Sequence, residues 1–262
     1  MSDYPMQAVK PTQATKPMQP IKPAATVILV RPAEPTFEIF MLRRTAKAAF
    51  AGGMYVFPGG RVDDEDHFNK YAQCCAEFLP SQTPQQEALG YDYRGFWVAG
   101  IRESFEEAGL LLAYDASGEL LGFPNAAIAQ EYAALREPLH DGSLSLFDLC
   151  EQQGLRLAVD QMHYYNRVVT PLGRPRRFDT RFFIAAAPTG QTGEHDHTET
   201  VDSIWISPQA ALAQHAEERF GLMRVTQNQL TELAAFDSCE ALLAMASTNT
   251  RFPVMRPLLP RD

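Results

Sequence analysis

Hydrophobic and polar positions alternate with a helical period in the middle of the chain. When residues 98–112 are drawn as a helix, one stripe is formed by Val98, Ile101, Phe105, Ala108 and Leu112. The opposite face carries Glu103, Glu106 and Glu107, and Gly109 stands where a left-handed C-cap is expected. The pattern predicts a helix that packs by one side and presents a cluster of carboxylates on the other.

Other segments show the alternation and residue types of strands and further helices. Runs rich in β-branched and aromatic residues predict strands at 24–31, 37–43, 155–159, 163–170, 177–186 and 201–206. Helical spacing and caps predict helices at 126–136, 145–152, 227–234 and 237–246, with another beginning after Ser207. The chain is therefore predicted to be a mixed α/β protein.

The first 23 residues differ in composition from the rest. Lys-Pro recurs at Lys10, Lys16 and Lys22, and proline at this density opposes both helix and sheet. We predict a disordered Lys-Pro-rich tail over residues 1–23 and a single domain over 24–262, whose last part, 216–262, is a helical extension. A partner-binding arm is the alternative interpretation of the tail.

Composition and charge narrow the class of protein. The chain has 262 residues, 45% of them hydrophobic, which is ordinary for a soluble globular protein. The formal net charge of −9 argues against general binding to nucleic acid or to a membrane surface. No apolar run approaches the ~20 residues that span a bilayer, and four cysteines without C-x-x-C spacing favour a reducing compartment. With neither a signal-peptide core nor a peroxisomal C-terminal address, we predict a cytoplasmic protein.

The three glutamates of the central helix are a candidate metal site. Like charges three or four residues apart destabilise a helix by roughly 0.2–0.5 kcal/mol per pair. Carboxylate oxygens are the ligands that Mg²⁺ and Mn²⁺ prefer. The alternative is a solvated acidic face, and the glycine pair upstream, at Gly59 and Gly60, favours the metal site.

The glycine pair and the helix together resemble the Nudix box, whose second half reads R-E-U-x-E-E-x-G-U with U a bulky aliphatic residue. The matching positions are Gly60, Arg102, Glu103, Glu106, Glu107, Gly109 and Leu110. Two residues depart from the pattern, because Asp66 replaces the first glutamate and Ser104 replaces an aliphatic residue. In addition, 35 residues separate Asp66 from Arg102 (102 − 66 − 1), 28 more than the seven of the pattern.

A box split in this way resembles the Nudix branch that includes peroxisomal coenzyme A diphosphatases, over roughly residues 24 to 215. The resemblance implies an α/β/α sandwich with a mixed sheet. The extra residues, 67–94, are predicted to form a helical insertion in two pieces, the second beginning with a capping box at Thr83 and ending at Gly90. An insertion placed there is expected to emerge near the site.

The resemblance also implies a chemistry for the site. Mg²⁺ or Mn²⁺ is expected on Glu103, Glu106, Glu107 and the carbonyl of Gly60, with Arg102 orienting the carboxylates. The general base is expected to be Glu103 or a carboxylate from the loop before residue 201, where Glu199 is preferred to Glu194. The pair of histidines in that loop, His195 and His197, could instead be read as a separate metal site, although such a pair is usually solvated.

Basic residues near these segments are candidates for binding substrate. Coenzyme A-type relatives are expected to carry an arginine at the position of Ala49, and Lys47 or Arg44 could replace it. Arginine suits bidentate phosphate contacts, and four arginines lie between positions 174 and 181. A solvated hairpin turn is the alternative for that run. The predicted substrate-binding residues are Arg44, Arg61, Arg174, Arg176 and Arg177.

These features lead to one preferred function and several alternatives. We predict a pyrophosphohydrolase that cleaves coenzyme A or acyl-CoA to 3′,5′-ADP and a phosphopantetheine. The alternatives are a pyrophosphatase acting on NADH or ADP-ribose, a Nudix module that binds a nucleotide without turnover, and a scaffold that uses the Lys-Pro tail. The expected partner is a small nucleoside diphosphate derivative, with no nucleic acid or membrane, and a homodimer is possible.

Overall fold

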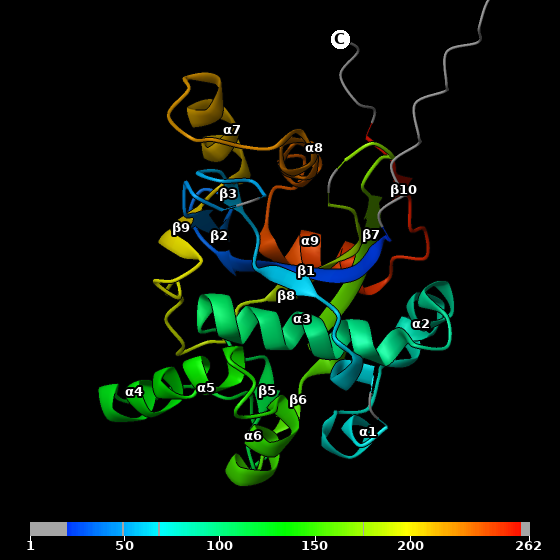
Figure 1. The fold of residues 1–262 in the computed structure, drawn as a ribbon, viewed down its shortest axis with the longest axis vertical. Helices are drawn as coiled ribbons and strands as arrows, with labels where there is room; N and C mark the ends of the chain where they lie inside the picture. The colour runs from blue at the N-terminus through cyan, green and yellow to red at the C-terminus, as the bar shows by residue number, and fades with distance from the viewer. Residues whose placement is uncertain (1–19, 49, 68, 175, 258–262) are drawn as a thin grey trace, which may run out of the picture.

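The predicted strands meet in one mixed sheet that divides the molecule into layers (Figure 1). The structure is a computed structural model, and it describes residues 20–48, 50–67, 69–174 and 176–257. The sheet has eight strands in the order β10-β7-β8-β1-β2-β3, with β4 also paired to β1 and β9 to β2. Two pairings are parallel, β1 with β8 and β7 with β10, so the sheet is mixed as predicted.

The longer strands follow the predicted runs closely, but within the predicted run 155–159 only residues 156–157 form a strand, and the short strands β3, β4, β5 and β10 were not predicted. The strands are β1 (Lys22–Pro32), β2 (Phe37–Arg44), β3 (Tyr55–Val56), β4 (Gly59–Arg61), β5 (Ala113–Tyr114), β6 (Arg156–Leu157), β7 (Met162–Val169), β8 (Phe178–Ala186), β9 (Thr200–Ile206) and β10 (Val254–Met255). Strands β5 and β6 form a separate two-stranded sheet.

Helices cover both faces of the large sheet. The helices are α1 (Tyr71–Cys74), α2 (Thr83–Leu89), α3 (Tyr93–Ala108), α4 (Ala126–Ala134), α5 (Arg136–His140), α6 (Leu146–Gln153), α7 (Pro208–Ala216), α8 (Arg224–Leu233) and α9 (Cys239–Ser247). Short 3₁₀ turns are η1 (Asp64–His67), η2 (Pro80–Gln82) and η3 (Val159–Gln161). In Figure 1, α3 crosses the sheet on one side with α4, α5 and α6 beyond it, and α7, α8 and α9 lie on the other side.

Two hydrophobic cores explain why the sheet is covered on both faces. Alternate residues of β1 point to opposite sides: Val27 and Leu29 join the core under α3, whereas Ile28 and Val30 join the core under α8 and α9. Trp97 of α3 is fully buried in the first core, and Leu230 of α8 in the second. The architecture is therefore the predicted α/β/α sandwich.

The insertion contains shorter helices than its sequence suggested. Only residues 71–74 form α1, because the chain then extends at Cys75 and Ala76 donates its N–H to the carbonyl of Leu157 at 2.9 Å. The second helix, α2, begins at Thr83 and ends before Gly90 (φ 83°). Thr83 is inside the helix and does not cap it, so the capping-box interpretation was wrong.

The two ends of the described chain can be compared with the predicted tail, residues 1–23, and with the predicted helical extension, residues 216–262. Strand β1 begins at Lys22, inside the range assigned to the tail, and residues 1–19 lie outside the described part of the chain. Beyond residue 216 the chain forms α8, α9 and the edge strand β10. Within the described residues, every helix is too short or too polar to cross a lipid bilayer.

Candidate active site

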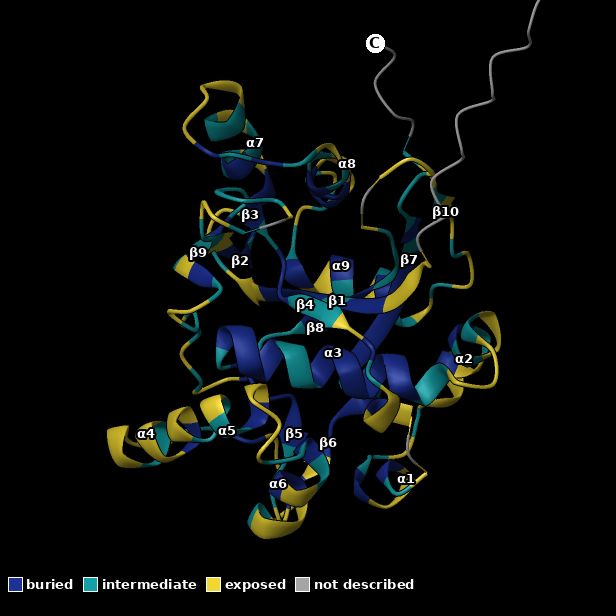
Figure 2. Ribbon diagram, in the orientation of Figure 1, coloured by how far each residue is buried: buried dark blue, intermediate teal, exposed yellow. Residues whose placement is uncertain are grey.

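Helix α3 supplies the predicted carboxylates from a rigid position. Gly109 follows the helix with φ 68°, and its N–H caps the carbonyls of Phe105 and Ser104. Ser104, which departs from the family pattern, is buried and donates its hydroxyl to the carbonyl of Leu110 at 3.0 Å. Figure 2 shows α3 buried along most of its length, so the carboxylate face is not a solvated one. Glu106 and Glu107 are only 6% and 5% exposed.

Two of the glutamates lie directly against the glycine pair of β4. The N–H of Gly59 donates to Oε2 of Glu107 at 2.9 Å. A Cβ atom on Gly60 would lie 2.4 Å from Oε1 of Glu103, so a residue with a side chain would displace that carboxylate. Strand β4 is held in place by β1, because Gly60 pairs with Ala25. The predicted convergence of helix and glycine turn is present.

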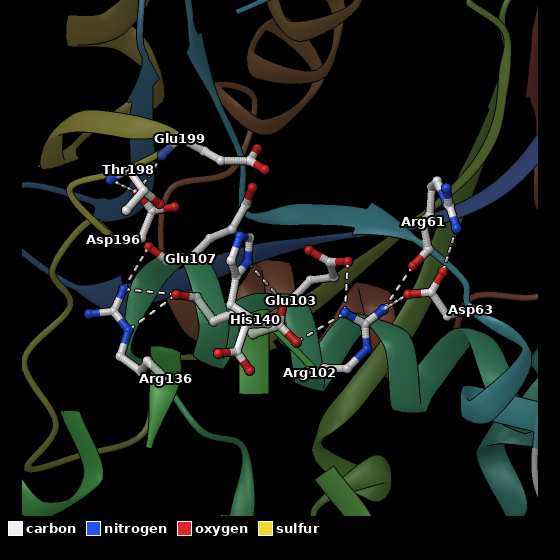
Figure 3. A network of polar contacts seen from close by, with 12 residues as sticks. Arg61, Asp63, Arg102, Glu103, Glu107, Arg136, His140, Asp196, Thr198 and Glu199 are labelled. Carbon is white, nitrogen blue, oxygen red and sulfur yellow. Dashed lines mark hydrogen bonds and ion pairs between the residues drawn. The ribbon is translucent and has the colours of Figure 1, made fainter. Parts of the chain in front are cut away.

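Arg102 ties Asp66, the residue just before the insertion, to the glutamates of α3, and Figure 3 shows its contacts with Glu103 and with the carbonyl of Arg61. Its guanidinium donates to both oxygens of Asp66 at 3.0 Å, to Glu103 at 3.0 Å and to Glu106 at 3.1 Å. It also donates to the carbonyl of Arg61 at 2.9 Å. Asp66 is buried, and its carboxylate holds one end of Arg102. Its side chain is one methylene shorter than that of the glutamate in the family pattern. Every carboxylate around Arg102 is thus fixed relative to the others.

Arg44 lies on the far side of the same cluster. Its side chain donates to Oε2 of Glu199 at 2.9 Å and lies 3.7 Å from Oε1 of Glu107. Glu199 is oriented by the preceding turn, in which Oδ1 of Asp196 accepts N–H groups from residues 198, 199 and 200. The loop carboxylate expected from the sequence therefore reaches the helix carboxylates through Arg44.

Two residues near the site carried no signal in the sequence. Arg136 of α5 donates to the carbonyls of Glu106, Glu107 and Glu194 at distances of 2.9 to 3.1 Å. It thereby joins the C-terminal end of α3 to the loop that carries Glu199. His140 places Nδ1 3.6 Å from Oε2 of Glu106. Only the fold brings α5 to this end of α3, so no local pattern could have identified either residue.

The cluster contains more negative than positive charge. Five carboxylates, those of Asp66, Glu103, Glu106, Glu107 and Glu199, share two guanidinium groups, those of Arg102 and Arg44. Burial raises the pKa of Glu103 well above its usual range, and the charges of Glu107 and Glu106 add to this rise while Arg102 opposes it. Burial likewise raises the pKa of Glu106, and it raises the pKa of Glu107 to about 8.

This charge balance bears on metal binding. Within the described residues, no group of three or more His, Cys, Asp or Glu side chains is positioned as it stands to hold a metal ion. The reason is visible in the contacts, because Arg102 separates Glu103 from Glu106 and Arg44 separates Glu107 from Glu199. The cluster nevertheless has more carboxylates than arginines, and it lies beside a glycine turn. Carboxylate oxygens are the hard donors that a divalent cation requires.

The other predicted residues lie outside this cluster. Arg61 is exposed and pairs with Asp63 at 2.7 Å. Arg174 and Arg176 are exposed in the β7–β8 connection, and the Nε of Arg177 donates to the carbonyl of Thr170 at 3.2 Å. Figure 1 shows this connection on the side of the sheet away from α3. The structure does not bring these arginines to the glutamates.

The histidine pair and the neighbourhood of Ala49 complete the predicted set. The rings of His195 and His197 lie 4.1 Å apart, and His197 contacts Glu194 at 3.3 Å. No metal-holding group of side chains includes them among the described residues. Ala49 itself lies outside the described residues. The next residue, Phe50, contacts Phe178 edge to face at 5.9 Å, which places the loop after β2 beside the start of β8.

Comparisons with known proteins agree with this arrangement. A family model described as the NUDT19 Nudix domain matches residues 77–234. The chain is 25% identical over 244 residues to the acyl-coenzyme A diphosphatase NUDT19 of Gallus gallus, covering 80% of this chain and 65% of that protein. It is 26% identical over 243 residues to the protein of the same name from Homo sapiens, covering 80% and 64%. The chain therefore spans less than two thirds of these relatives.

A solved structure supports the fold. The crystal structure of a NUDIX hydrolase from Alicyclobacillus acidocaldarius superposes with a TM-score of 0.74 and 24% sequence identity. The match covers 88% of this chain and 98% of that one. The sandwich described above is therefore the fold of that hydrolase along nearly its whole length.

Proposed function

The chain belongs to the Nudix family, in the branch of the NUDT19 Nudix domain, and from this premise we propose that it hydrolyses a diphosphate linkage in a nucleoside diphosphate derivative. Coenzyme A or an acyl-CoA is the first substrate to test, with 3′,5′-ADP and a phosphopantetheine as products. The proposal for the substrate rests on the names of the two relatives, which are acyl-coenzyme A diphosphatases.

One observation carries the proposal of hydrolysis. Three glutamates from one helix lie beside a glycine turn, two of them buried, with Glu103 against Gly60 and Glu107 bonded to the N–H of Gly59. Keeping this much negative charge out of water is costly unless a cation accompanies it. A diphosphate is itself an anion, so an acidic cluster can receive it only together with cations. The site is thus suited to a metal–diphosphate substrate.

The residues present would hold Mg²⁺ or Mn²⁺ through Glu103, Glu106, Glu107 and the carbonyl of Gly60. A divalent ion bound there would neutralise charge on the phosphoryl oxygens and lower the pKa of a bound water. Arg102 and Arg44, which now lie between the glutamates, leave room for such ions only if their side chains shift. Asp66 provides the place to which Arg102 can withdraw, since it already accepts two of its N–H groups.

The remaining roles are those of the general base and of the residues that orient the carboxylates. A carboxylate that accepts the proton of the attacking water is required, and Glu103 and Glu199 are the candidates for this role. Glu199 is the more exposed of the two, with a side chain 45% accessible against 13% for Glu103. Arg102 orients the carboxylates, as its contacts to three of them indicate, and Arg136 holds the end of α3 against the Glu199 loop.

The arginines of the β7–β8 connection would bind the part of the substrate beyond the diphosphate. The contact of Phe50 with Phe178 joins this connection to the loop that carries Lys47, so basic residues from two segments flank the same end of the sheet. A 3′-phosphate of coenzyme A is an appropriate ligand for such a group. NADH and ADP-ribose, which lack that phosphate, remain the alternative substrates. Arg61, cytoplasmic location and a homodimer also stay predictions.

A screen of diphosphate metabolites tests the proposal. The protein would be incubated with coenzyme A, acyl-CoA, NADH and ADP-ribose in the presence of Mg²⁺ or Mn²⁺, and products would be identified by mass. Cleavage of the diphosphate in at least one compound is expected. If every compound is recovered intact while calorimetry detects binding, the chain is a nucleotide-binding module and not a hydrolase.

A further inference from the structure

Three of the four cysteines in the chain gather at one place, away from the glutamates. Cys74 ends α1 and Cys75 follows it, whereas Cys150 comes from α6. Cys74 and Cys150 line the same cavity, Cys75 is the chain neighbour of Cys74, and all are free thiols. The fourth cysteine, Cys239, is buried at the start of α9 on the other face of the sheet. This grouping is used by no step of the proposed hydrolysis.

The two helices meet in a register that pairs Cys74 with Cys150. The rings of Tyr71 and Phe147 pack edge to face with centroids 5.9 Å apart. Tyr71 lies three residues before Cys74, and Phe147 lies three residues before Cys150. Residues three apart share one face of a helix. The aromatic pair therefore packs α1 against α6, and Cys74 and Cys150, each three residues further along its helix, line the same cavity.

Cys75 is held differently, which leaves Cys74 as the partner of Cys150. At Cys75 the backbone is extended (φ −97°, ψ 148°), and this residue bridges to Leu157 of β6. The following N–H, of Ala76, donates to the carbonyl of Leu157 at 2.9 Å. The strand-like pairing anchors the chain directly after α1. Cys74 is thus fixed from both sides, by the helix pair before it and by β6 after it.

A small oxidant can reach this pair. A cavity of about 200 Å³ is lined by Cys74 and Cys150 together with Gln73, Phe147, Glu151 and Leu155. A water molecule occupies about 30 Å³ in the liquid, so the cavity admits a molecule the size of hydrogen peroxide. Hydrogen bonds with Cys150 and Cys75, aided by the charge of Lys70, lower the pKa of Cys74 to about 4 although burial opposes this. A thiolate is the nucleophilic form of cysteine.

We propose that Cys74 and Cys150 are a reversible thiol–disulfide pair that reacts with hydroperoxides. The Cys74 thiolate attacks one oxygen of the hydroperoxide, the O–O bond breaks, and a sulfenic acid forms while the leaving oxygen takes a proton as water or alcohol. The sulfur of Cys150 then attacks the sulfenic sulfur, forming the S–S bond and releasing hydroxide, which the Cys150 proton converts to water. Two thiols are oxidised and one hydroperoxide is reduced.

The bond would join the insertion to the body of the domain. Residues 67–94 interrupt the box between Asp66 and Arg102, and α1 is the first helix in this segment. A cross-link to α6 closes a long loop, which restricts the unfolded chain. The oxidised protein is therefore expected to unfold at a higher temperature than the reduced protein. This inference is independent of the proposed hydrolysis and stands or fails separately.

Mass spectrometry of the full chain tests the pair. The reduced protein is treated with a stoichiometric amount of hydrogen peroxide, alkylated in denaturant and digested with trypsin. We expect the loss of two alkylation sites and a cross-link between peptides 71–94 and 137–156, which a dithiol reductant reverses together with the thermal shift. A protein that keeps all four sites, or that loses them without this cross-link, overturns the proposal.

Single substitutions identify which cysteines form the cross-link. Cys75→Ser is expected to retain the link, whereas Cys74→Ser and Cys150→Ala lose it. In Cys150→Ala the sulfenic acid on Cys74 should accumulate and be trapped by dimedone. The matched control, Cys239→Ser, removes the buried cysteine on the other face and should oxidise like the unaltered protein. A link that persists in Cys74→Ser, or a bond confined to peptide 71–94, contradicts the pairing.

Discussion

Two ionic clusters flank the same residue of β1 and have opposite charge balance. Ala25 pairs with Gly60 on one side, under Glu103, and with Arg181 on the other. The guanidinium of Arg181 lies 4.4 Å from the ring centroid of Phe96 in α3, so both clusters lie on the α3 side of the sheet. We call them the glutamate cluster and the Asp179 clamp.

The Asp179 clamp is closed. One carboxylate is held by two guanidinium groups, from Arg167 at 2.6 Å and from Arg181 at 2.8 Å. Burial alone would raise the pKa of Asp179, but hydrogen bonds and charge from both arginines outweigh it and hold the pKa below its usual range. In the glutamate cluster burial raises the pKa of Glu103 and of Glu107, and neighbouring carboxylates add to this rise, although Arg102 and Arg44 oppose it.

From this comparison we propose that the ratio of carboxylates to arginines distinguishes a cation-binding site from a structural ion pair. In the Asp179 clamp two arginines neutralise one carboxylate, so we expect the clamp to contribute to stability. In the glutamate cluster carboxylates outnumber arginines, so we expect it to bind further cations. Substitutions in the two clusters should therefore separate activity from stability.

The largest expected effect follows from Glu106→Gln. This change keeps the shape of the side chain but removes one charge and one hard oxygen donor. Metal-dependent turnover is expected to fall by about 100-fold or more, equal to about 3 kcal/mol of transition-state stabilisation. The free energy of unfolding without metal should stay the same or rise, because repulsion among the carboxylates is relieved. Steady-state kinetics and urea unfolding measure the two quantities.

Glu131→Gln is the matched control, since Glu131 is exposed on α4. It should change neither turnover nor stability. Near-full turnover in Glu106→Gln on every diphosphate tested would remove Glu106 from the metal site.

The second effect concerns the Asp179 clamp, where a substitution should lower stability and leave turnover nearly unchanged. Asp179→Asn leaves Arg167 and Arg181 without a counter-charge and is expected to lower the free energy of unfolding by about 2 kcal/mol. Breaking fully buried pairs costs about 3–5 kcal/mol, and the value here is smaller because the side chain of Arg167 is 34% exposed. Turnover should change much less than in Glu106→Gln. Urea unfolding checks this against exposed Asp237→Asn, and equal midpoints for the two variants would contradict it.

The sequence predicted the parts of these clusters that depend on local pattern. Helical period, the C-cap at Gly109 and the glycine pair at Gly60 are encoded within a few residues, and the structure confirms the helix and its approach to the turn. The strands followed from alternation for the same reason. Local pattern was less reliable in the insertion, where the pairing of Cys75 with Leu157 ends α1 early.

The missing parts depend on contacts between distant segments. Arg102 meets Asp66 across the insertion, and Arg136 meets the end of α3 only because α5 folds back onto it. The Asp179 clamp depends on the register of β7 with β8, in which Arg167 pairs with Arg181. Arg181 falls among the candidate phosphate ligands in the sequence because no local pattern encodes the register that brings Arg167 of β7 to Asp179.

The arginines of the β7–β8 connection form a third group, separate from the clamp and from the glutamate cluster, in which Arg174 and Arg176 are exposed and Arg177 is half-buried. If they bind the 3′-phosphate of coenzyme A, changing Arg176 and Arg177 to alanine should reduce kcat/KM for coenzyme A about tenfold more than for dephospho-coenzyme A. Tenfold corresponds to about 1.4 kcal/mol. Parallel kinetics on both compounds give the answer, and equal losses would dismiss a role in 3′-phosphate binding.

The smallest effect concerns pH and the stability that a metal adds. The pKa of Glu107 is raised to about 8 in the folded chain, whereas an unfolded glutamate titrates near ~4.3. The stability contributed by the protonated carboxyl is therefore fully present below the unfolded value and is lost as pH rises through the folded one. Mg²⁺ requires the ionised carboxylate, so its stabilising effect should grow over the same range.

Thermal unfolding with and without Mg²⁺ at pH 6.0 and pH 8.5 measures this difference. We expect Mg²⁺ to stabilise the protein by about 1 kcal/mol more at the higher pH, which is about 2–4 °C in Tm for a chain of this size. In Glu107→Gln the dependence of the Mg²⁺ effect on pH should become smaller, because one of the groups that release a proton is gone. In Asp179→Asn the dependence of the Mg²⁺ effect on pH should persist, because Asp179 of the unaltered protein is ionised at both pH values and so releases no proton between them. A Mg²⁺ effect that is equal at both pH values in the unaltered protein would mean that cations do not replace the proton of Glu107, and the surplus of carboxylates would then need another explanation.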